Sequence, residues 1–314
     1  MNRSAVSGHL SMFVANVAWG LMSPLAKIVM VGGIVTPFVL TELRIFGAMV
    51  LFWAVSFFGR YEHVALRDKA RLFVASLLAI VFNQGSFIFG VGMSSPADAS
   101  IIATSMPLWA MILAAFILKE PITGKKVAGI AFGAGGALLL ILGSNQGGAA
   151  PEGDNRMLGN LLVLTAQLSY AFYLVFFKNF VSRYSVVTIM KWMFTYAFVC
   201  TLPFSYRDLI ATQWHELGLP AVGAIGFIVV CATFMCYMLV VVGQKYLRPT
   251  VAGMYNYIQP LIACVVSVCL GMDSFNVMKS FAVVMIFGGV YLVSVSKSKA
   301  MLDKEAENLT GGKR

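Results

Sequence analysis

Long apolar runs, separated only by short polar or charged stretches, follow one another along the whole chain. We place ten of them, at residues 9–30, 37–58, 71–92, 97–118, 125–143, 157–178, 187–205, 219–242, 250–271 and 279–297. A helix needs about 20 predominantly apolar residues to cross a bilayer, and these runs have roughly that length. Because the apolar residues are continuous and do not alternate with polar ones, the pattern excludes the strands of a transmembrane barrel. We therefore predict an all-α membrane protein with ten transmembrane helices.

The composition agrees with this assignment. Hydrophobic residues make up 59% and charged residues 11% of the 314 residues, against about 45–50% and about 25% in ordinary soluble domains. One soluble core cannot bury so many apolar side chains, so the lipid bilayer is an expected partner.

The net charge of +10 would suggest nucleic acid as a partner if the basic residues were clustered. They lie instead in alternate loops. With the N-terminus in the cytoplasm, 17 Lys and Arg residues are cytoplasmic, three are outside and three lie within apolar runs. This bias predicts a multi-pass protein with both termini cytoplasmic, and we expect no nucleic-acid partner.

The chain contains a second copy of its own plan, 153 residues further on. Pro96 and Pro107 meet Pro249 and Pro260 at this offset, Glu120 meets Asp273, and Gly135-Gly136 meets Gly288-Gly289. Two prolines could coincide by accident, but an acidic residue and a glycine pair in the same register indicate an internal duplication.

Each copy holds five predicted helices, an odd number, so the second copy must cross the membrane in the opposite sense to the first. The predicted organisation is a cytoplasmic N-terminus (1–8), repeat 1 (9–143), an extracytoplasmic linker (144–156), repeat 2 (157–297) and a cytoplasmic tail (298–314). Inverted repeats of this kind are typical of secondary transporters, whose site lies where the repeats meet.

Several short motifs can be compared with known families. They are Ser94-Ser95, Pro107-Leu108 and Leu118-Lys119-Glu120 in the fourth run, Ala18-Trp19-Gly20 in the first, Arg44 in the second, and Pro260-Leu261 in the ninth. In these motifs the chain resembles the EamA family of the drug/metabolite transporter superfamily over about residues 8–297. Asp273 departs from the pattern, since the family usually has Glu there.

The resemblance implies a ten-helix carrier in a bacterial cell membrane, with a central cavity lined by both halves. It further implies export of amino acids or related compounds by alternating access, since many relatives are exporters. The alternative is a carrier of sugar-linked, nucleotide-linked or other anionic metabolites. That alternative requires a cation such as Lys27 or Arg44 to reach the central space.

Polar side chains inside apolar runs are costly unless they face protein or water. The candidates for substrate binding are Asn16, Trp19, Asn83, Gln84, Thr104, Gln167, Tyr170, Tyr255, Asn256 and Gln259. Amides and aromatic rings suit a small zwitterion or a neutral polar solute. The other interpretation is that these side chains join neighbouring helices.

Two prolines and two carboxylates are candidates for moving parts. Pro107 and Pro260 lie in mid-run, where a proline frees a carbonyl and permits either a static kink or a gate. Asp98 and Glu42 are candidates for proton coupling, although both fall near the outer ends of their runs and could be water-exposed vestibule carboxylates. Arg44 could instead anchor to backbone carbonyls or a helix end.

The sequence does not favour an enzyme, a cofactor or a metal site. His9, His63 and His215 lie at a terminus or in loops, and the five cysteines lack metal-ligand spacing. No nucleotide-binding loop of the GxxxxGK[ST] type is present. The glycines of the fifth and tenth runs indicate close packing, either within the monomer or at the face of a homodimer.

Overall fold

The computed structural model describes residues 3–59, 62–117, 124–143, 155–181, 183–246, 255–274 and 277–294, and every regular element in these ranges is helical. The elements are α1 (Arg3–Val31), α2 (Pro37–Phe58), α3 (Leu66–Ser76), η1 (Leu77–Phe82), α4 (Asn83–Met93), α5 (Pro96–Ala103), α6 (Met106–Ile117), α7 (Gly124–Gly143), α8 (Arg156–Val181), α9 (Val186–Ala211), η3 (Trp214–Glu216), α10 (Leu219–Gly226), η4 (Phe227–Met235), α11 (Cys236–Tyr246), η5 (Tyr255–Tyr257), α13 (Ile258–Cys269) and α14 (Val277–Ser294). Of these, η1 and η4 are π-helices, and η3 and η5 are 3₁₀ turns. Most of the expected linker (144–154), the tail (298–314) and Glu120 lie outside the described residues.

Seven helical stretches in the described ranges are long and apolar enough to cross a membrane: Val6–Val31, Pro37–Phe58, Leu66–Met93, Pro96–Ile117, Arg156–Phe177, Val186–Ala211 and Leu219–Gly243. Three shorter apolar helices, Val127–Leu139, Ile258–Cys269 and Val277–Gly289, fall in the runs expected at 125–143, 250–271 and 279–297. The prediction of an all-helical membrane protein is therefore confirmed, with seven of the ten expected spans present at full length.

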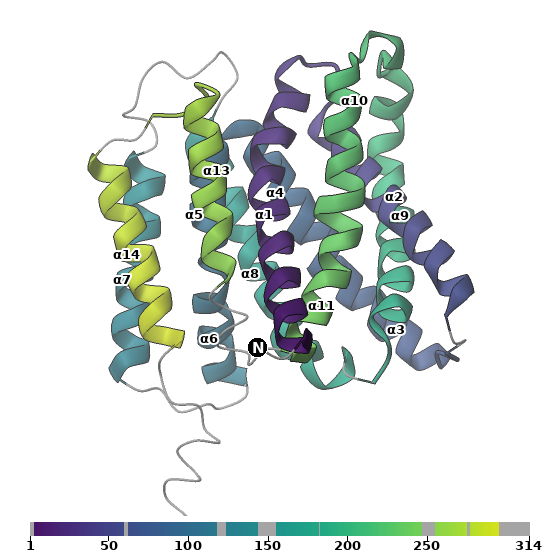
Figure 1. Ribbon diagram of the computed structural model, residues 1–314, viewed down its shortest axis with the longest axis horizontal. Helices are drawn as coiled ribbons and strands as arrows, with labels where there is room; N and C mark the ends of the chain where they lie inside the picture. Colours follow the sequence, from purple (N-terminus) through teal and green to yellow (C-terminus); the bar gives the residue numbers. More distant parts are fainter. Residues whose placement is uncertain are drawn as a thin grey trace, which may run out of the picture.

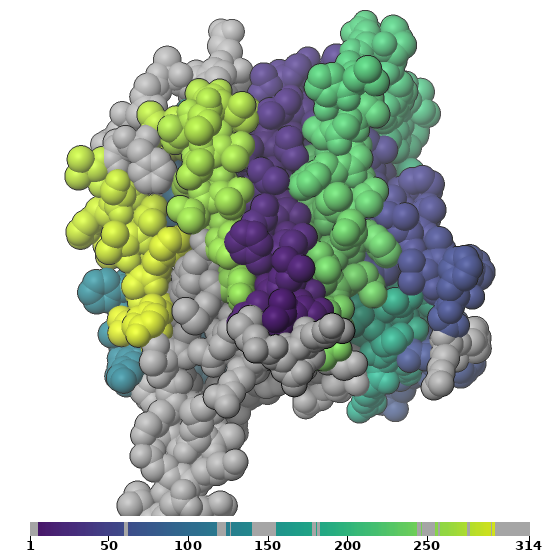
Figure 2. All heavy atoms as spheres, in the orientation of Figure 1, coloured from purple at the N-terminus to yellow at the C-terminus, as the bar shows by residue number. Residues whose placement is uncertain are grey.

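The helices stand side by side in one bundle (Figure 1). Many large apolar side chains of the described helices are exposed, among them Phe57, Phe58 and Phe204. On the face shown in Figure 2, α1 fills the space between α13 and the α10–α11 stretch, and its side chains Leu10 and Phe13 are 60% and 49% exposed.

The helices of the first half pack mainly against helices of the second half. The principal pairs are α7 with α14, α2 with α9, α4 with α8, α1 with α11 and α1 with α13. Figure 1 shows α7 and α14 together at one side of the bundle, away from α2 and α9 at the other. The two halves therefore intermesh and do not form separate bundles.

Local sequence explains where these helices begin. The Thr36 hydroxyl accepts a hydrogen bond from the Val39 amide at the start of α2, and the Ser95 hydroxyl accepts one from the Asp98 amide at the start of α5. A proline follows each of these capping residues, at a position where its missing N–H would have no partner in any case.

Two spans contain a π-helical segment at corresponding positions. Residues 77–82 form η1 in the third span, and residues 230–235, which follow them by 153, lie within η4 in the eighth span. A π-segment shifts the backbone hydrogen bonds and leaves carbonyls for other donors, which is why such segments are frequent at functional sites.

The fourth span departs from the expected kinked helix. It is broken at Thr104 and Ser105 into α5 and α6, and Pro107 is the second residue of α6. The amide of Ser105 donates to the Ile102 carbonyl, three residues back, which ends α5. Pro260 occupies a similar place, because it is the third residue of α13 and follows the 3₁₀ turn η5. Each proline thus opens a helix, where it costs little.

The glycines of α7 and α14 pack within the chain. A Cβ at Gly289 would lie 2.6 Å from the Gly129 carbonyl oxygen, and one at Gly136 would lie 2.8 Å from the Ala282 carbonyl oxygen. Such backbone contact needs glycine. At these positions the intramolecular interpretation is the correct one, and a homodimer stays a prediction.

Candidate functional site

A hydrogen bond between Gln84 of α4 and Tyr237 of α11 joins the two halves in the interior. The Gln84 amide donates to the Tyr237 hydroxyl over 3.2 Å, and the Gln84 side chain is buried. These positions are 153 residues apart, the offset between the repeats. Two equivalent positions of the predicted repeats thus touch each other.

Neighbouring contacts repeat in the same way. The Asn83 amide donates to the Ala166 carbonyl over 2.9 Å, and the Cys236 thiol donates to the Ala15 carbonyl over 3.3 Å. Cys236 follows Asn83 by 153 residues, and Ala166 follows Ala15 by 151. The packing of α4 on α8 is thus matched by the packing of α11 on α1.

Glycines extend this correspondence. A Cβ at Gly90 would lie 2.7 Å from the Gly159 carbonyl oxygen, and a Cβ at Gly159 would lie 2.7 Å from the Gly90 carbonyl oxygen. The corresponding positions are Gly243 and Gly8, where a Cβ on Gly243 would lie 3.5 Å from the Gly8 carbonyl oxygen. Both helix crossings depend on the absence of a side chain.

Aromatic rings surround the Gln84–Tyr237 pair. The Tyr237 ring centroid lies 6.4 Å from that of Trp19 on α1 and 5.9 Å from that of Phe194 on α9, both edge to face. Tyr170 and Tyr173 of α8, with ring centroids 5.5 Å apart, pack in the same hydrophobic cluster as Tyr237 and Phe194. We call these residues, together with Arg44, the central cluster (Trp19, Arg44, Gln84, Tyr170, Tyr173, Phe194 and Tyr237).

Arg44 brings a positive charge to the central cluster. Its side chain is 4% exposed, and its Nε donates to the Thr233 hydroxyl of η4 over 3.2 Å. Thr233 lies one turn before Tyr237 on the same stretch of helix. Arg44 was expected to anchor to a backbone carbonyl or a helix end; it contacts a side chain of the other half instead.

A second pair of predicted residues meets on α1. The Gln259 amide of α13 donates to the Asn16 side-chain oxygen over 2.7 Å, and the Asn16 amide donates to the Met12 carbonyl. One turn further, the Trp19 indole donates over 3.0 Å to the Ala232 carbonyl, which lies in the π-segment η4. Asn16 and Trp19 of α1 thus contact two helical elements of the second half, α13 and η4.

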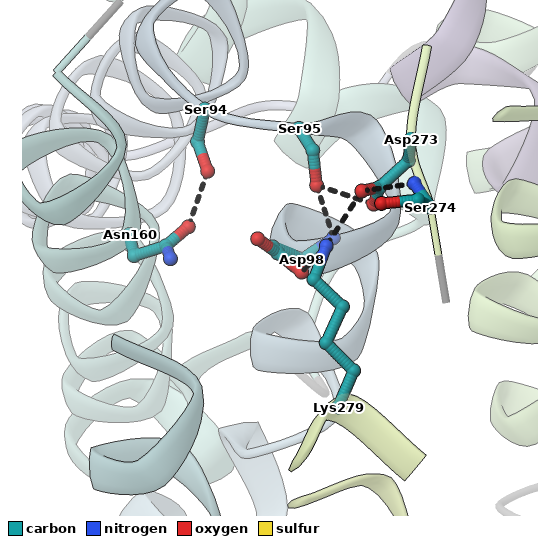
Figure 3. Close-up of polar contacts among 7 residues, drawn as sticks. All are labelled: Ser94, Ser95, Asp98, Asn160, Asp273, Ser274 and Lys279. Carbon is teal, nitrogen blue, oxygen red and sulfur yellow. Dashed lines mark hydrogen bonds and ion pairs between the residues drawn. The ribbon is translucent and has the colours of Figure 1, made fainter. Parts of the chain in front are cut away.

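A group of charged residues lies at the end of the bundle where α5 and α14 begin (Figure 3). The Lys279 ammonium of α14 lies 3.0 Å from Asp98 Oδ1 and 2.6 Å from Asp273 Oδ1, and the Ser95 hydroxyl donates to Asp273 Oδ2 over 2.8 Å. We call Ser95, Asp98, Asp273 and Lys279 the end cluster. Beside it, the Ser94 hydroxyl donates to the Asn160 side-chain oxygen of α8.

The two candidate carboxylates are buried, contrary to the expectation of water-exposed vestibule groups. The Asp98 side chain has no exposed area, and the Glu42 residue is 2% exposed. Glu42 faces Thr201 and Ser205 of α9, but these hydroxyls donate to carbonyls of their own helix. Neither Glu42 oxygen therefore accepts a hydrogen bond from a described residue.

The remaining predicted residues lie apart from the central cluster or beside it. The Tyr255 hydroxyl is 2.8 Å from Nδ1 of His9, and Asn256 is partly buried in the same turn, η5. Thr104 is buried at the end of α5 and donates to the Ile101 carbonyl. Gln167 is buried on α8, next to the carbonyl that accepts from Asn83.

Sequence reasoning missed Tyr237 and Lys279. Tyr237 could have been found by applying the repeat offset to Gln84, which was already a candidate. Lys279 was counted as a loop charge because it stands at the end of an apolar run, yet its residue is only 7% exposed. Asp273, the repeat counterpart of Glu120, contacts Lys279 of α14 and Ser95 at the start of α5.

Comparison with known proteins shows which family has this architecture. The EamA-like transporter family matches residues 6–142 and again residues 157–295. A solved crystal structure, 20% identical in sequence, shares the fold with a TM-score of 0.59 and is matched over 91% of this chain and 95% of its own.

Individual relatives are transporters. The chain is 30% identical to a probable amino-acid metabolite efflux pump of Escherichia coli (strain K12), over 68% of this chain and 69% of that protein. It is 21% identical to the uncharacterized transporter YetK of Bacillus subtilis (strain 168), over 78% and 73%, and 20% identical to an S-adenosylmethionine uptake transporter of Rickettsia bellii (strain RML369-C), over 82% and 84%. Family and relatives indicate a multi-pass membrane transporter and not an enzyme. Because the family matches both halves of the chain, this protein belongs to the EamA-like transporter family.

Proposed function

We propose that the protein is a secondary carrier that exports amino acids or related small metabolites by alternating access. The observation that carries the proposal is the central cluster, where polar and aromatic side chains of both halves meet around the Gln84–Tyr237 pair. Secondary transporters place their sites near mid-membrane between repeats. The efflux pump of Escherichia coli among the relatives supports the substrate class and the direction.

The moving parts in this proposal are two inverted halves of five helices each. The matched contacts of Asn83 and Cys236, and of Gly90 and Gly243, support a two-fold relation between them. The positive-inside bias supports cytoplasmic termini. Rocking of one half against the other would break the Gln84–Tyr237 contact and open the central cluster to one side.

The end cluster acts as a gate in this proposal. It ties α5 of the first half to α14 of the second through buried ion pairs, so opening at this end requires Lys279 to part from a carboxylate. The helix breaks before Pro107 and Pro260 supply hinges further along the spans that carry Asp98 and Asp273. Asp98 and Glu42 remain the candidates for carrying a proton, since buried carboxylates of this kind mark proton relays in membranes.

Arg44 favours one alternative, a carrier of sugar-linked, nucleotide-linked or other anionic metabolites. A guanidinium binds phosphate well. Lys27, the other cation in question, donates to the Gly92 carbonyl, outside the central cluster.

Counterflow in proteoliposomes tests the proposal. Vesicles preloaded with unlabelled amino acids should take up labelled members of the same pool above the level of protein-free vesicles. Tyr237→Phe, which removes the hydroxyl bound by Gln84, should lower this uptake. Tyr206→Phe is the matched control, because Tyr206 is 44% exposed on α9. Uptake of labelled nucleotide sugars, with none for amino acids, would instead support the alternative.

A further inference from the structure

Arg44 is a buried cation without a countercharge. Among the described residues no carboxylate forms an ion pair with it, and its Nη1 is buried without a hydrogen-bond partner. Arginine stays protonated in proteins, so it cannot escape this cost by losing its proton. A buried, unpaired charge is strongly unfavourable, and an anionic group placed beside it would offset that cost. The structure contains such a charge where the two halves meet.

Among the described residues, Gln84 lacks a donor for its side-chain oxygen, whereas Arg44 lacks an acceptor for Nη1. The Gln84 amide nitrogen donates to Tyr237, but no described residue donates a hydrogen bond to its buried Oε1. Both groups belong to one neighbourhood, because Arg44 hydrogen-bonds Thr233, one turn before Tyr237 on the same stretch of helix. Gln84 thus contacts Tyr237 itself, and Arg44 contacts the residue one turn before it.

The remaining surroundings are apolar and aromatic. Trp19, Phe194, Tyr170 and Tyr173 provide the rings around Tyr237, and Phe194 is fully buried. Only one fixed positive charge is present in the cluster. A phosphate carries between one and two negative charges at neutral pH, which a single guanidinium would leave partly uncompensated. One carboxylate is matched by one guanidinium.

Building on the proposed function, we infer that the central cluster binds a zwitterionic α-amino acid with an apolar or aromatic side chain. Arg44 binds the carboxylate through Nη1, Gln84 Oε1 accepts from the α-ammonium, and the aromatic rings pack against the side chain. Separation of the halves at the Gln84–Tyr237 contact gives the ligand access. Both requirements, carboxylate and ammonium, must then be met by one ligand.

Ligand binding to the purified, detergent-solubilised protein tests this without transport. Thermal unfolding is measured with L-phenylalanine, L-leucine and L-methionine, each compared with its decarboxylated amine and its deaminated acid. A ligand that binds only the folded protein raises the Tm with concentration. We expect a rise with at least one amino acid and a much smaller one with its amine and its acid. Equal stabilisation by an amine or an acid, or none by any amino acid, would overturn the inference.

Substitutions of Arg44 test whether this residue binds the amino acid. Arg44→Gln should weaken amino-acid binding roughly 10- to 100-fold, since it removes a charge-assisted hydrogen bond. Arg44→Lys should weaken it less. Lys191→Gln is the control for loss of a buried cation, because the Lys191 ammonium lies over the ring of Trp53, more than two turns after Arg44 on α2. If Arg44→Gln does not fold, Arg44→Lys and the wild-type ligand series still decide. An unchanged affinity in either folded Arg44 variant contradicts the assignment.

The experiments can contradict the proposed carrier and the inferred ligand independently of each other. Counterflow of any solute that is not an amino acid, in vesicles whose protein is not stabilised by amino acids, leaves a carrier and removes the inferred ligand. Stabilisation by an amino acid without any counterflow removes the carrier and leaves the site.

Discussion

Lys279 lies 3.0 Å from Asp98, although the two residues belong to different repeats and are 181 positions apart. The same ammonium lies 2.6 Å from Asp273 (Figure 3). Two carboxylates therefore share one positive charge in a place where the Asp98 side chain has no contact with solvent. Loss of the cation and loss of one carboxylate should have very different consequences there.

Lys279→Met should destabilise the protein by about 3–5 kcal/mol, because it leaves two buried carboxylates without a cation. Asp98→Asn should cost much less, since it keeps a neutral Lys279–Asp273 pair. Thermal or denaturant unfolding of the two variants measures the difference. Equal destabilisation would show that the end cluster is not held together by this charge balance.

Glu42→Gln should leave stability unchanged or raise it, because neither carboxylate oxygen accepts a hydrogen bond from a described residue. If Glu42 carries the proton in transport, the variant should keep counterflow but lose uptake driven by a pH gradient. Glu216→Gln, in the exposed turn η3, is the control. Gradient-driven uptake that persists in Glu42→Gln excludes this role.

Gly90→Ala should destabilise the protein by about 1–3 kcal/mol, because the new methyl group would meet the Gly159 backbone where α4 and α8 cross. Gly85→Ala on the same helix has open space and should be neutral or stabilising, by up to about 1 kcal/mol from helix propensity. Unfolding curves of the two single variants give the comparison. Similar stability of both would mean that the α4–α8 crossing is not limited by backbone contact.

Glu62, in the loop before α3, should make stability depend on acid pH. Slight burial raises the pKa of this carboxyl, but hydrogen bonds from Thr188 and from the amide and hydroxyl of Ser185 outweigh it and hold the pKa below its ordinary value. A lowered pKa in the folded state stabilises the protein above the ordinary carboxyl pKa, and this contribution disappears as the pH falls through the lowered value. Glu62→Gln should therefore lose less stability than the wild type on acidification. Parallel pH profiles of the Tm would contradict this.

Much of the architecture can be predicted from the sequence of each helix taken by itself. The apolar runs predict the helices because lipid accepts only backbone groups that are bonded within a helix, and each run overlaps a helical stretch of the described structure. The offset between Pro107 and Pro260 predicts two related halves, and polar side chains inside apolar runs predict candidates such as Gln84 and Asn16.

The partners of those candidates were decided by the tertiary structure. Periodicity places Gln84 on a face of its own helix, but only the packing of α4 and α11 brings it to Tyr237, 153 residues away. Arg44 looked like a helix anchor until its contact with Thr233 placed it beside the same tyrosine. Lys279 looked like a loop charge until α14 carried it to Asp98. The physical reason is that burial of a helix face is a local property of composition, whereas the pairing of charges and amides between the halves depends on which faces meet and at what height.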